Sequence, residues 1–349
     1  MKLKIFTTML TSFFLVLGCS NSNPKRDKFD TTLYDGRPIE TLSTDVPPLS
    51  EKEAITRGDI ALTNNNLDLA LYEYIRSLSF EEARFQDKTL YNIGRIHQSR
   101  NNNLLAEKAY LMAVKSNPNH IPSLTKLGVE YSKSGSIELG ESYLLRAVNA
   151  DQARLSSQLR VNKDKKIDNK LIQALLVDNQ SPEEALMALG VLADVREQHD
   201  LAQAWYSKAL MVDGSSAKTL MNLGYSYYMS GDYTTAQRFT LASLEKQPEN
   251  DKALNNLALI YLAKGEVRRG LSVFQQKMET PEALNNVGYI LMIQGKPDKA
   301  IPYLQQAINM KPNYYKVANE NLERALALVK EERVKIKGKK RAYRSLFVK

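Results

Sequence analysis

The stretch that decides the fold lies in the second half of the chain. Residues 217–250 read AKTLMNLGYSYYMSGDYTTAQRFTLASLEKQPEN, with small and large apolar residues at fixed offsets. The small Gly224 and Ala236 let two helix axes approach closely, Gly231 permits a turn between the helices, and Pro248 ends the second helix. The stretch therefore predicts an antiparallel pair of helices.

The same pattern recurs on both sides of this stretch. Gly190, Gly224 and Ala258 follow one another at a constant interval, and Gly288 follows after a slightly shorter one. One helical pair cannot cover its own apolar face, so successive pairs are expected to stack into a solenoid. Small residues that recur with a period of about 34 residues are typical of the tetratricopeptide repeat, or TPR. We therefore predict an all-α fold, a TPR superhelical solenoid of helix-turn-helix repeats.

The repeats fall into two predicted sub-arrays. Residues 51–150 carry three repeats, with asparagine runs replacing glycine in the first two turns because asparagine tolerates left-handed backbone angles. Residues 183–332 carry four repeats and a capping helix. Residues 151–182 lack the small-residue pattern and are polar and lysine-rich, which indicates an irregular connector. The sequence leaves open whether this connector is an extended hinge or a degenerate helical pair.

The amino terminus predicts export. Residues 1–18 combine Lys2 and Lys4 with a mostly apolar run too short to span a bilayer comfortably, which is typical of a signal peptide. The sequence VLGC that ends at Cys19 resembles a bacterial lipobox, and this only cysteine of the chain is the expected lipidation site. Residues 19–50 are polar and contain four prolines, so we expect a disordered tether between the lipid and the repeats.

The residue after Cys19 is serine rather than aspartate. In the lipoprotein sorting system of Gram-negative envelopes, this resemblance implies transfer to the outer membrane. The lipid anchor would then hold the repeats at that membrane, facing the periplasm.

The carboxy terminus is strongly basic. Residues 333–349 contain eight lysines or arginines and no acid, so they account for most of the net charge of +9. The segment is either a solvated disordered tail or a contact for an acidic partner or anionic headgroups. The export signal disfavours nucleic acid as that partner.

Residues suited to catalysis or metal binding are sparse. His97, His120 and His199 are the only histidines, and no two of them share the spacing of metal ligands. The sequence contains neither a nucleophile elbow around a serine nor a glycine-rich phosphate loop. We therefore predict no enzymatic activity, no metal, no cofactor and no small-molecule substrate.

Binding of a protein is the function that the repeats favour. The inner face of such arrays is lined by the first helix of each repeat, and in the second sub-array its predicted positions are rich in methionine and tyrosine, which adapt to varied partners. A groove of this composition suits an amphipathic helix or an apolar peptide. The alternative is that tight curvature buries these side chains against neighbouring helices. The predicted groove residues are Met187, Val191, Met221, Tyr225, Tyr228, Met229, Asn256, Leu259, Leu262, Asn286, Tyr289, Met292 and Ile293.

The last repeat and its cap carry a more specific resemblance. The sequence ALNNVGY at 283–289, then Gly295 and Ala300, and finally PNYY at 312–315 resemble the TPR lipoproteins of bacterial pilus systems, in particular the TadD type of the Flp (tight adherence) pilus. This resemblance implies an assembly factor that is not a pilus subunit. It also implies a pilotin-like role, in which the protein helps a secretin to reach the outer membrane and multimerise there. The alternative is an adaptor that docks peptidoglycan or envelope-biogenesis enzymes.

Overall fold

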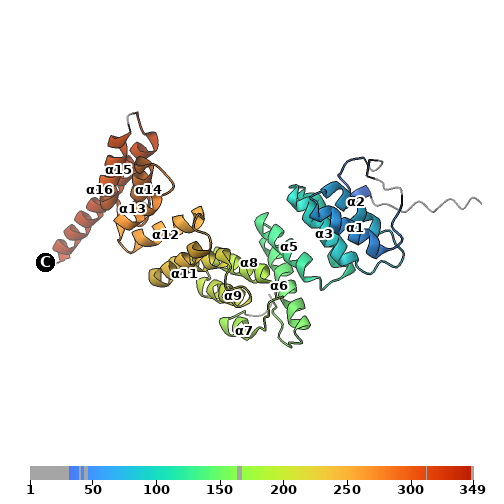
Figure 1. Cartoon of the computed structure of the whole chain (residues 1–349). Helices are drawn as coiled ribbons and strands as arrows, with labels where there is room; N and C mark the ends of the chain where they lie inside the picture. The colour runs from blue at the N-terminus through green and yellow to red at the C-terminus, as the bar shows by residue number, and fades with distance from the viewer. Residues whose placement is uncertain (1–30, 39–40, 43–45, 163–166, 312, 347–349) are drawn as a thin grey trace, which may run out of the picture. The chain divides into compact units, whose positions relative to one another are not determined.

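The computed structural model describes residues 31–38, 41–42, 46–162, 167–311 and 313–346. Within these ranges all the regular structure is helical, from the 3-10 helix η1 (Thr31–Leu33) to α16 (Lys316–Leu346) (Figure 1). The predicted signal peptide and the predicted lipidation site Cys19 lie outside the described residues. None of the described helices is long and apolar enough to cross a membrane.

The chain forms two compact units, residues 1–102 and 103–349. The first unit contains α1 (Glu51–Thr63), α2 (Leu67–Ser77) and α3 (Gln86–Ser99).

Small residues bring α1 and α2 together as the repeat pattern predicts. A side-chain carbon added to Gly58 would lie 2.7 Å from the ring of Tyr74, and the Tyr74 hydroxyl donates a 2.6 Å hydrogen bond to Asp59 on α1. Burial and this contact with a carboxylate both raise the pKa of Tyr74. Asn65 and Asn101 adopt φ values of 55° and 59°, which confirms that asparagine takes the left-handed turn position in these repeats.

A short segment before α1, residues 31–38, contacts the first unit, and we call it the strap. Leu33 is fully buried, and its carbonyl oxygen accepts a 2.9 Å hydrogen bond from Nε2 of His97 on α3. Asp35 accepts hydrogen bonds from Arg100 at 3.1 Å and from Asn102 at 2.8 Å. The described part of the segment is therefore not a free tether, contrary to the prediction of disorder over 19–50.

Leu33→Ala is expected to release the strap. Truncating a fully buried leucine costs about 2–5 kcal/mol, and Leu33 is the one residue of the strap that is buried. The prediction is faster amide hydrogen exchange at residues 31–37 while α1 and α2 keep their protection. Leu49→Ala is the control because Leu49 is 86% exposed. Equal protection of the strap in both variants would contradict its docking through Leu33.

The second unit contains the remaining helices. In order, these are α4 (Asn103–Ser116), α5 (Ile121–Lys133), α6 (Ile137–Arg154), α7 (Asn169–Ala174), α8 (Glu183–Val195), α9 (His199–Val212), α10 (Ala217–Met229), α11 (Tyr233–Lys246), α12 (Asp251–Ala263), α13 (Val267–Phe274), α14 (Thr280–Ile293), α15 (Pro297–Met310) and α16. The four repeats predicted after the connector appear as the packed pairs α8–α9, α10–α11, α12–α13 and α14–α15. Their turns contain Gly231, Gly265 and Gly295 at positive φ.

The connector between the predicted sub-arrays is a looped-out insertion. Helix α6 packs directly against α8, so the stacking of repeats continues across it. The insertion carries only the short α7 in its described part, and α7 packs on α9.

Polar side chains fix this insertion to the repeats. The Gln152 amide group bonds to the backbone of Leu176 through both its nitrogen and its oxygen, at 2.8 and 3.1 Å. The buried Lys208 donates from Nζ to the carbonyl oxygens of Gln173 and Leu175, at 2.8 and 3.0 Å, where the carboxy-terminal end of α7 favours a cation. These anchored contacts favour neither of the two alternatives left open for 151–182, a free hinge or a degenerate repeat.

The last helix extends further than predicted. Helix α16 begins as the expected cap, with Ala318 and Ala325 fully buried and Asn321 donating a 3.0 Å hydrogen bond to Asn285 on α14. It then continues as helix through the basic segment as far as Leu346. Of the two alternatives for the basic segment, the helix disfavours a disordered tail over residues 333–346, where lysine and arginine favour helix.

Candidate functional site: an apolar stripe on the first helices

The predicted groove residues divide into three classes by exposure. Met187, Leu262 and Met292 are buried in the core, so they are not available to a partner. Met221, Tyr228, Asn256, Leu259 and Asn286 are half-buried. Val191, Tyr225, Met229, Tyr289 and Ile293 are exposed. The alternative of complete burial therefore holds for part of the predicted groove only.

The exposed members occupy equivalent repeat positions. Tyr225 and Met229 lie one turn apart on α10, and Val191 and Val195 hold the same places one repeat earlier, on α8. Tyr289 and Ile293 repeat the pair on α14, where their exposed fractions are 40% and 60%. We call these six residues the apolar stripe. Val195 was missed by the sequence analysis, although its offset from Met229 is the repeat period and it is 66% exposed.

Helix α12 lies between α10 and α14 and contacts both. Its equivalent positions hold the half-buried Leu259 and Ala263. The exposed positions of the stripe are therefore interrupted at α12, where the equivalent side chains are half-buried. Exposed apolar surface repeated at fixed positions typically marks an interaction site.

Tyr228 belongs to the wall beside the stripe rather than to its exposed part. Its ring lies 6.1 Å from that of Tyr225 and 5.8 Å from that of Tyr233, measured between centroids. Burial raises the pKa of Tyr228, and the side-chain amide of Gln294 beside the hydroxyl opposes this shift. Gln294 follows α14, two repeats away, so the Tyr228 side chain lies near residues of both repeats.

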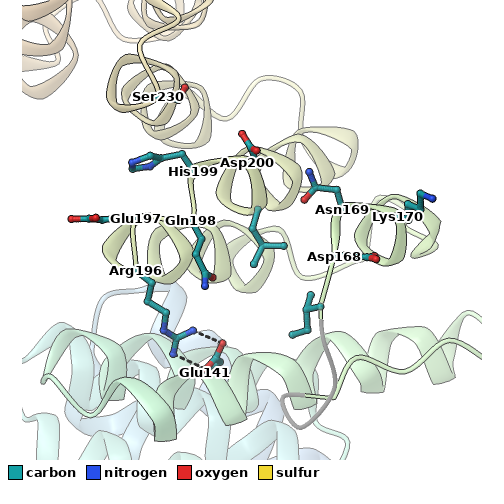
Figure 2. Close-up of a pocket in the computed structure, with 12 residues that line it drawn as sticks. Glu141, Asp168, Asn169, Lys170, Arg196, Glu197, Gln198, His199, Asp200 and Ser230 are labelled. Carbon is teal, nitrogen blue, oxygen red and sulfur yellow. Dashed lines mark hydrogen bonds and ion pairs between the residues drawn. The ribbon is translucent and has the colours of Figure 1, made fainter.

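A polar cavity of about 960 Å³ lies elsewhere in the second unit, where the insertion meets the turn between α8 and α9 (Figure 2). Asp168 and Lys170 come from the insertion, Glu141 from α6 and His199 from the start of α9. Arg196 bonds to both oxygens of Glu141, each at 2.7 Å, as the dashed lines in Figure 2 show. The cationic and anionic groups of the wall thus neutralise one another in part.

The hydrogen bonds around Asp194 do not form a catalytic relay. Its carboxylate accepts from Nδ1 of His199 at 2.9 Å, from the Tyr206 hydroxyl at 3.0 Å and from the Ser226 hydroxyl at 2.7 Å. A nucleophilic serine would have to bond to the imidazole instead. The contacts join α8, α9 and α10, and burial together with Asp194 raises the pKa of Tyr206. No three potential metal-ligating side chains converge among the described residues.

Glu197 occupies the left-handed turn position that glycine takes in the other repeats of this unit, with φ of 59°. Glu197→Gly is expected to stabilise the second unit by about 0.5–1 kcal/mol, because glycine lacks the Cβ that disfavours this backbone angle. The measurement is urea unfolding followed by the fluorescence of Trp205, the only tryptophan, on the adjacent α9. Glu197→Ala keeps the Cβ and is the control. Equal stabilisation by both substitutions would assign the effect to the lost carboxylate.

Comparison with known proteins supports the repeat assignment. The tetratricopeptide repeat family matches residues 221–276 and residues 281–314. A BBSome complex member BBS4 homolog from Drosophila melanogaster is 26% identical over 105 residues, which is 30% of this chain. The matched region spans only 22% of the length of that relative.

Solved structures resemble the chain at low sequence identity. A tetratricopeptide repeat protein from Parabacteroides merdae is 18% identical, with 80% of this chain and 100% of that chain covered and a TM-score of 0.49. PilW, a widely conserved type IV pilus biogenesis factor, is 17% identical, with 70% of this chain and 100% of that chain covered and a TM-score of 0.47. Tetratricopeptide repeats are thus matched within residues 221–276 and 281–314, where the chain forms stacked helical pairs, and this repeat fold typically serves as a scaffold for binding other proteins.

Proposed function

We propose that the protein is an outer-membrane lipoprotein that acts as a non-enzymatic assembly factor in the biogenesis of an Flp or type IV-like pilus, with pilotin-like support of the secretin. The observation that carries the binding part of this proposal is the apolar stripe. Six apolar side chains at equivalent positions of α8, α10 and α14 are exposed, and none of them belongs to the core cluster formed by α12 to α16.

The chemistry of the stripe selects its ligand. Tyrosine and methionine supply contact area that adapts to varied apolar surfaces. On α8, α10 and α14 the stripe residues form pairs that lie one helical turn apart. This spacing matches an amphipathic helix, which presents apolar residues three or four positions apart. We propose that a helical segment of the secretin lies across the stripe.

The cellular part of the proposal rests on sequence features. The lipobox-like VLGC that ends at Cys19 supplies a membrane address, and the TadD-like sequence of 283–315 supplies the connection to the Flp pilus. Lipidation would keep the repeats at the outer membrane, where a secretin assembles. The strap contacts the first unit through Leu33 and Asp35, so the described chain meets that unit before α1 begins.

The test is photo-crosslinking in intact envelopes from a residue of the stripe. A photoreactive amino acid replaces Tyr289, and the same amino acid at Tyr314 is the control, since Tyr314 is 78% exposed but lies outside the stripe. The proposal expects a secretin or another pilus assembly protein to be captured from position 289 only. Capture of peptidoglycan enzymes from position 289 would instead support the adaptor function, and the same products from both positions would overturn the groove assignment.

A further inference from the structure

The side chains of α16 become exposed past the residues that pack on the repeats, as far as they are described. Its first half packs on α14 and α15 through Ala318, Leu322 and Ala325. Every described residue from Lys330 to Lys335 is exposed, including Val334 at 63%. The helix nevertheless continues to Leu346, so about four turns extend beyond the repeats.

The apolar pattern of α16 also continues beyond the repeats. Leu322, Val329, Ile336 and Tyr343 recur every seven residues, so they share one face of the helix. The first two are half-buried against the array. By the same register, Ile336 and Tyr343 fall on the face of α16 that carries Leu322 and Val329.

Cations flank this apolar face of α16 on both sides. Arg333, Lys337, Lys340 and Arg344 follow one another at intervals of three or four residues, which places them on one neighbouring face. Lys335 and Lys339 fall on the other flank by the same register. Residues 333–349 contain no acid, whereas the remainder of the chain is nearly neutral, since the tail accounts for eight of the nine net positive charges.

We infer that the carboxy-terminal half of α16 is an interfacial helix that binds the surface of an anionic phospholipid bilayer. A helix with an apolar face and flanking cations lies in the plane of the interface, with its lysine and arginine heads reaching the phosphates. The charge argues against pairing with a second copy, because two such segments would bring eight positive charges each into contact. This inference is independent of the proposed partner of the apolar stripe.

The first measurement is vesicle co-sedimentation of the full-length chain carrying Cys19→Ser, which removes the proposed acylation site. Vesicles of phosphatidylcholine alone are compared with vesicles that hold one part phosphatidylglycerol to two parts phosphatidylcholine. The expected result is clearly stronger binding to the anionic vesicles than to the neutral ones, whatever residues 1–18 contribute equally to both. At about 1 M salt, where the screening length falls to about 3 Å, most of this binding should be lost.

Substitutions test separately how the cationic face and the apolar face of α16 contribute to vesicle binding. Lys337→Gln, Lys340→Gln and Arg344→Gln together should reduce the affinity for anionic vesicles roughly tenfold or more, because each cation near the surface contributes to the attraction. The matched control removes three exposed cations from the repeats, Lys218→Gln, Lys252→Gln and Arg268→Gln, and should leave binding unchanged. Ile336→Ser with Tyr343→Ser keeps every charge and should still weaken binding severalfold.

Three results would overturn the inference. An equal loss of vesicle binding in the triple variant of α16 and in the triple variant of the repeats would show that only the net charge of the chain matters. Equal binding to neutral and anionic vesicles would exclude a role for the cations. Absence of vesicle binding, with an acidic protein captured through the same three cations, would assign the helix to a protein partner. All variants share residues 1–30, so any contribution of that region cancels in the comparison.

Discussion

Gly190→Val is expected to destabilise the second unit by about 3 kcal/mol or more. A side-chain carbon at this position of α8 would lie 2.6 Å from the ring of Tyr206 on α9. That ring cannot retreat easily, because Tyr206 is almost fully buried and its hydroxyl bonds to Asp194. Overpacking of a close-packed core typically costs about 1–3 kcal/mol, and the second methyl group of valine adds to that cost.

The effect can be measured locally because Trp205 precedes Tyr206 and is 2% exposed. Its fluorescence should report a lower urea midpoint in the variant. The matched control is Gly214→Val, since an added side-chain carbon there would meet nothing closer than 3.5 Å. Similar midpoints for the two variants would contradict the close approach of α8 and α9 that defines the repeat.

Tyr225→Glu combined with Tyr289→Glu is expected to abolish partner binding, with a loss of about 100-fold or more. Both side chains are exposed, so the free protein tolerates the charges. A helix that covers the stripe would bury two carboxylates without partners, and each unpaired buried charge costs several kcal/mol. Tyr228 is left unchanged because its half-buried ring contacts Tyr225 and Tyr233, so a charge there could disturb folding as well as binding.

The measurement is the amount of multimeric secretin in envelopes, with far-ultraviolet circular dichroism of the purified protein as a check of helicity. Tyr314→Glu is the control for a charge at an exposed tyrosine outside the stripe. Loss of multimers in the double variant alone supports the binding surface. A normal level of secretin multimers in the double variant would show that the stripe does not bind the partner.

The repeats could be predicted from the sequence because their small residues are a steric requirement. Gly190, Gly224 and Gly288 each lie within about 3 Å of a side chain on the paired helix once a Cβ is added, so the spacing of these glycines reports the packing directly. The asparagine turns follow from the backbone angles that asparagine tolerates. Local patterns of this kind are visible without knowledge of distant contacts.

The strap and the insertion could not be predicted in the same way, because single long-range contacts hold them. Leu33 is one leucine in a polar segment, and its burial depends on His97 and Arg100 more than sixty residues away. Lys208 looks like an ordinary helix residue until its Nζ is placed on two carbonyl groups of the insertion. Such contacts leave no periodic signal in the sequence.

The exposure of the predicted groove residues could be predicted only in part. The repeat positions identified Tyr225, Met229, Tyr289 and Ile293 as members of one face, but they could not separate exposed residues from Met187 and Met292, which the neighbouring helices bury. Exposure depends on how closely the neighbouring helices pack over each position, and the sequence of a single repeat does not show that packing.

The most direct test of the account is the reactivity of a cysteine placed in the stripe. Tyr289→Cys is labelled with a maleimide in the purified protein and in envelopes that contain the assembled secretin, and the unsubstituted chain with its single Cys19 gives the background. The account predicts rapid labelling of the purified protein and strong protection in the envelopes. Slow labelling of the purified protein, or equally rapid labelling in both, would contradict a stripe that is free in the isolated chain and covered by its partner.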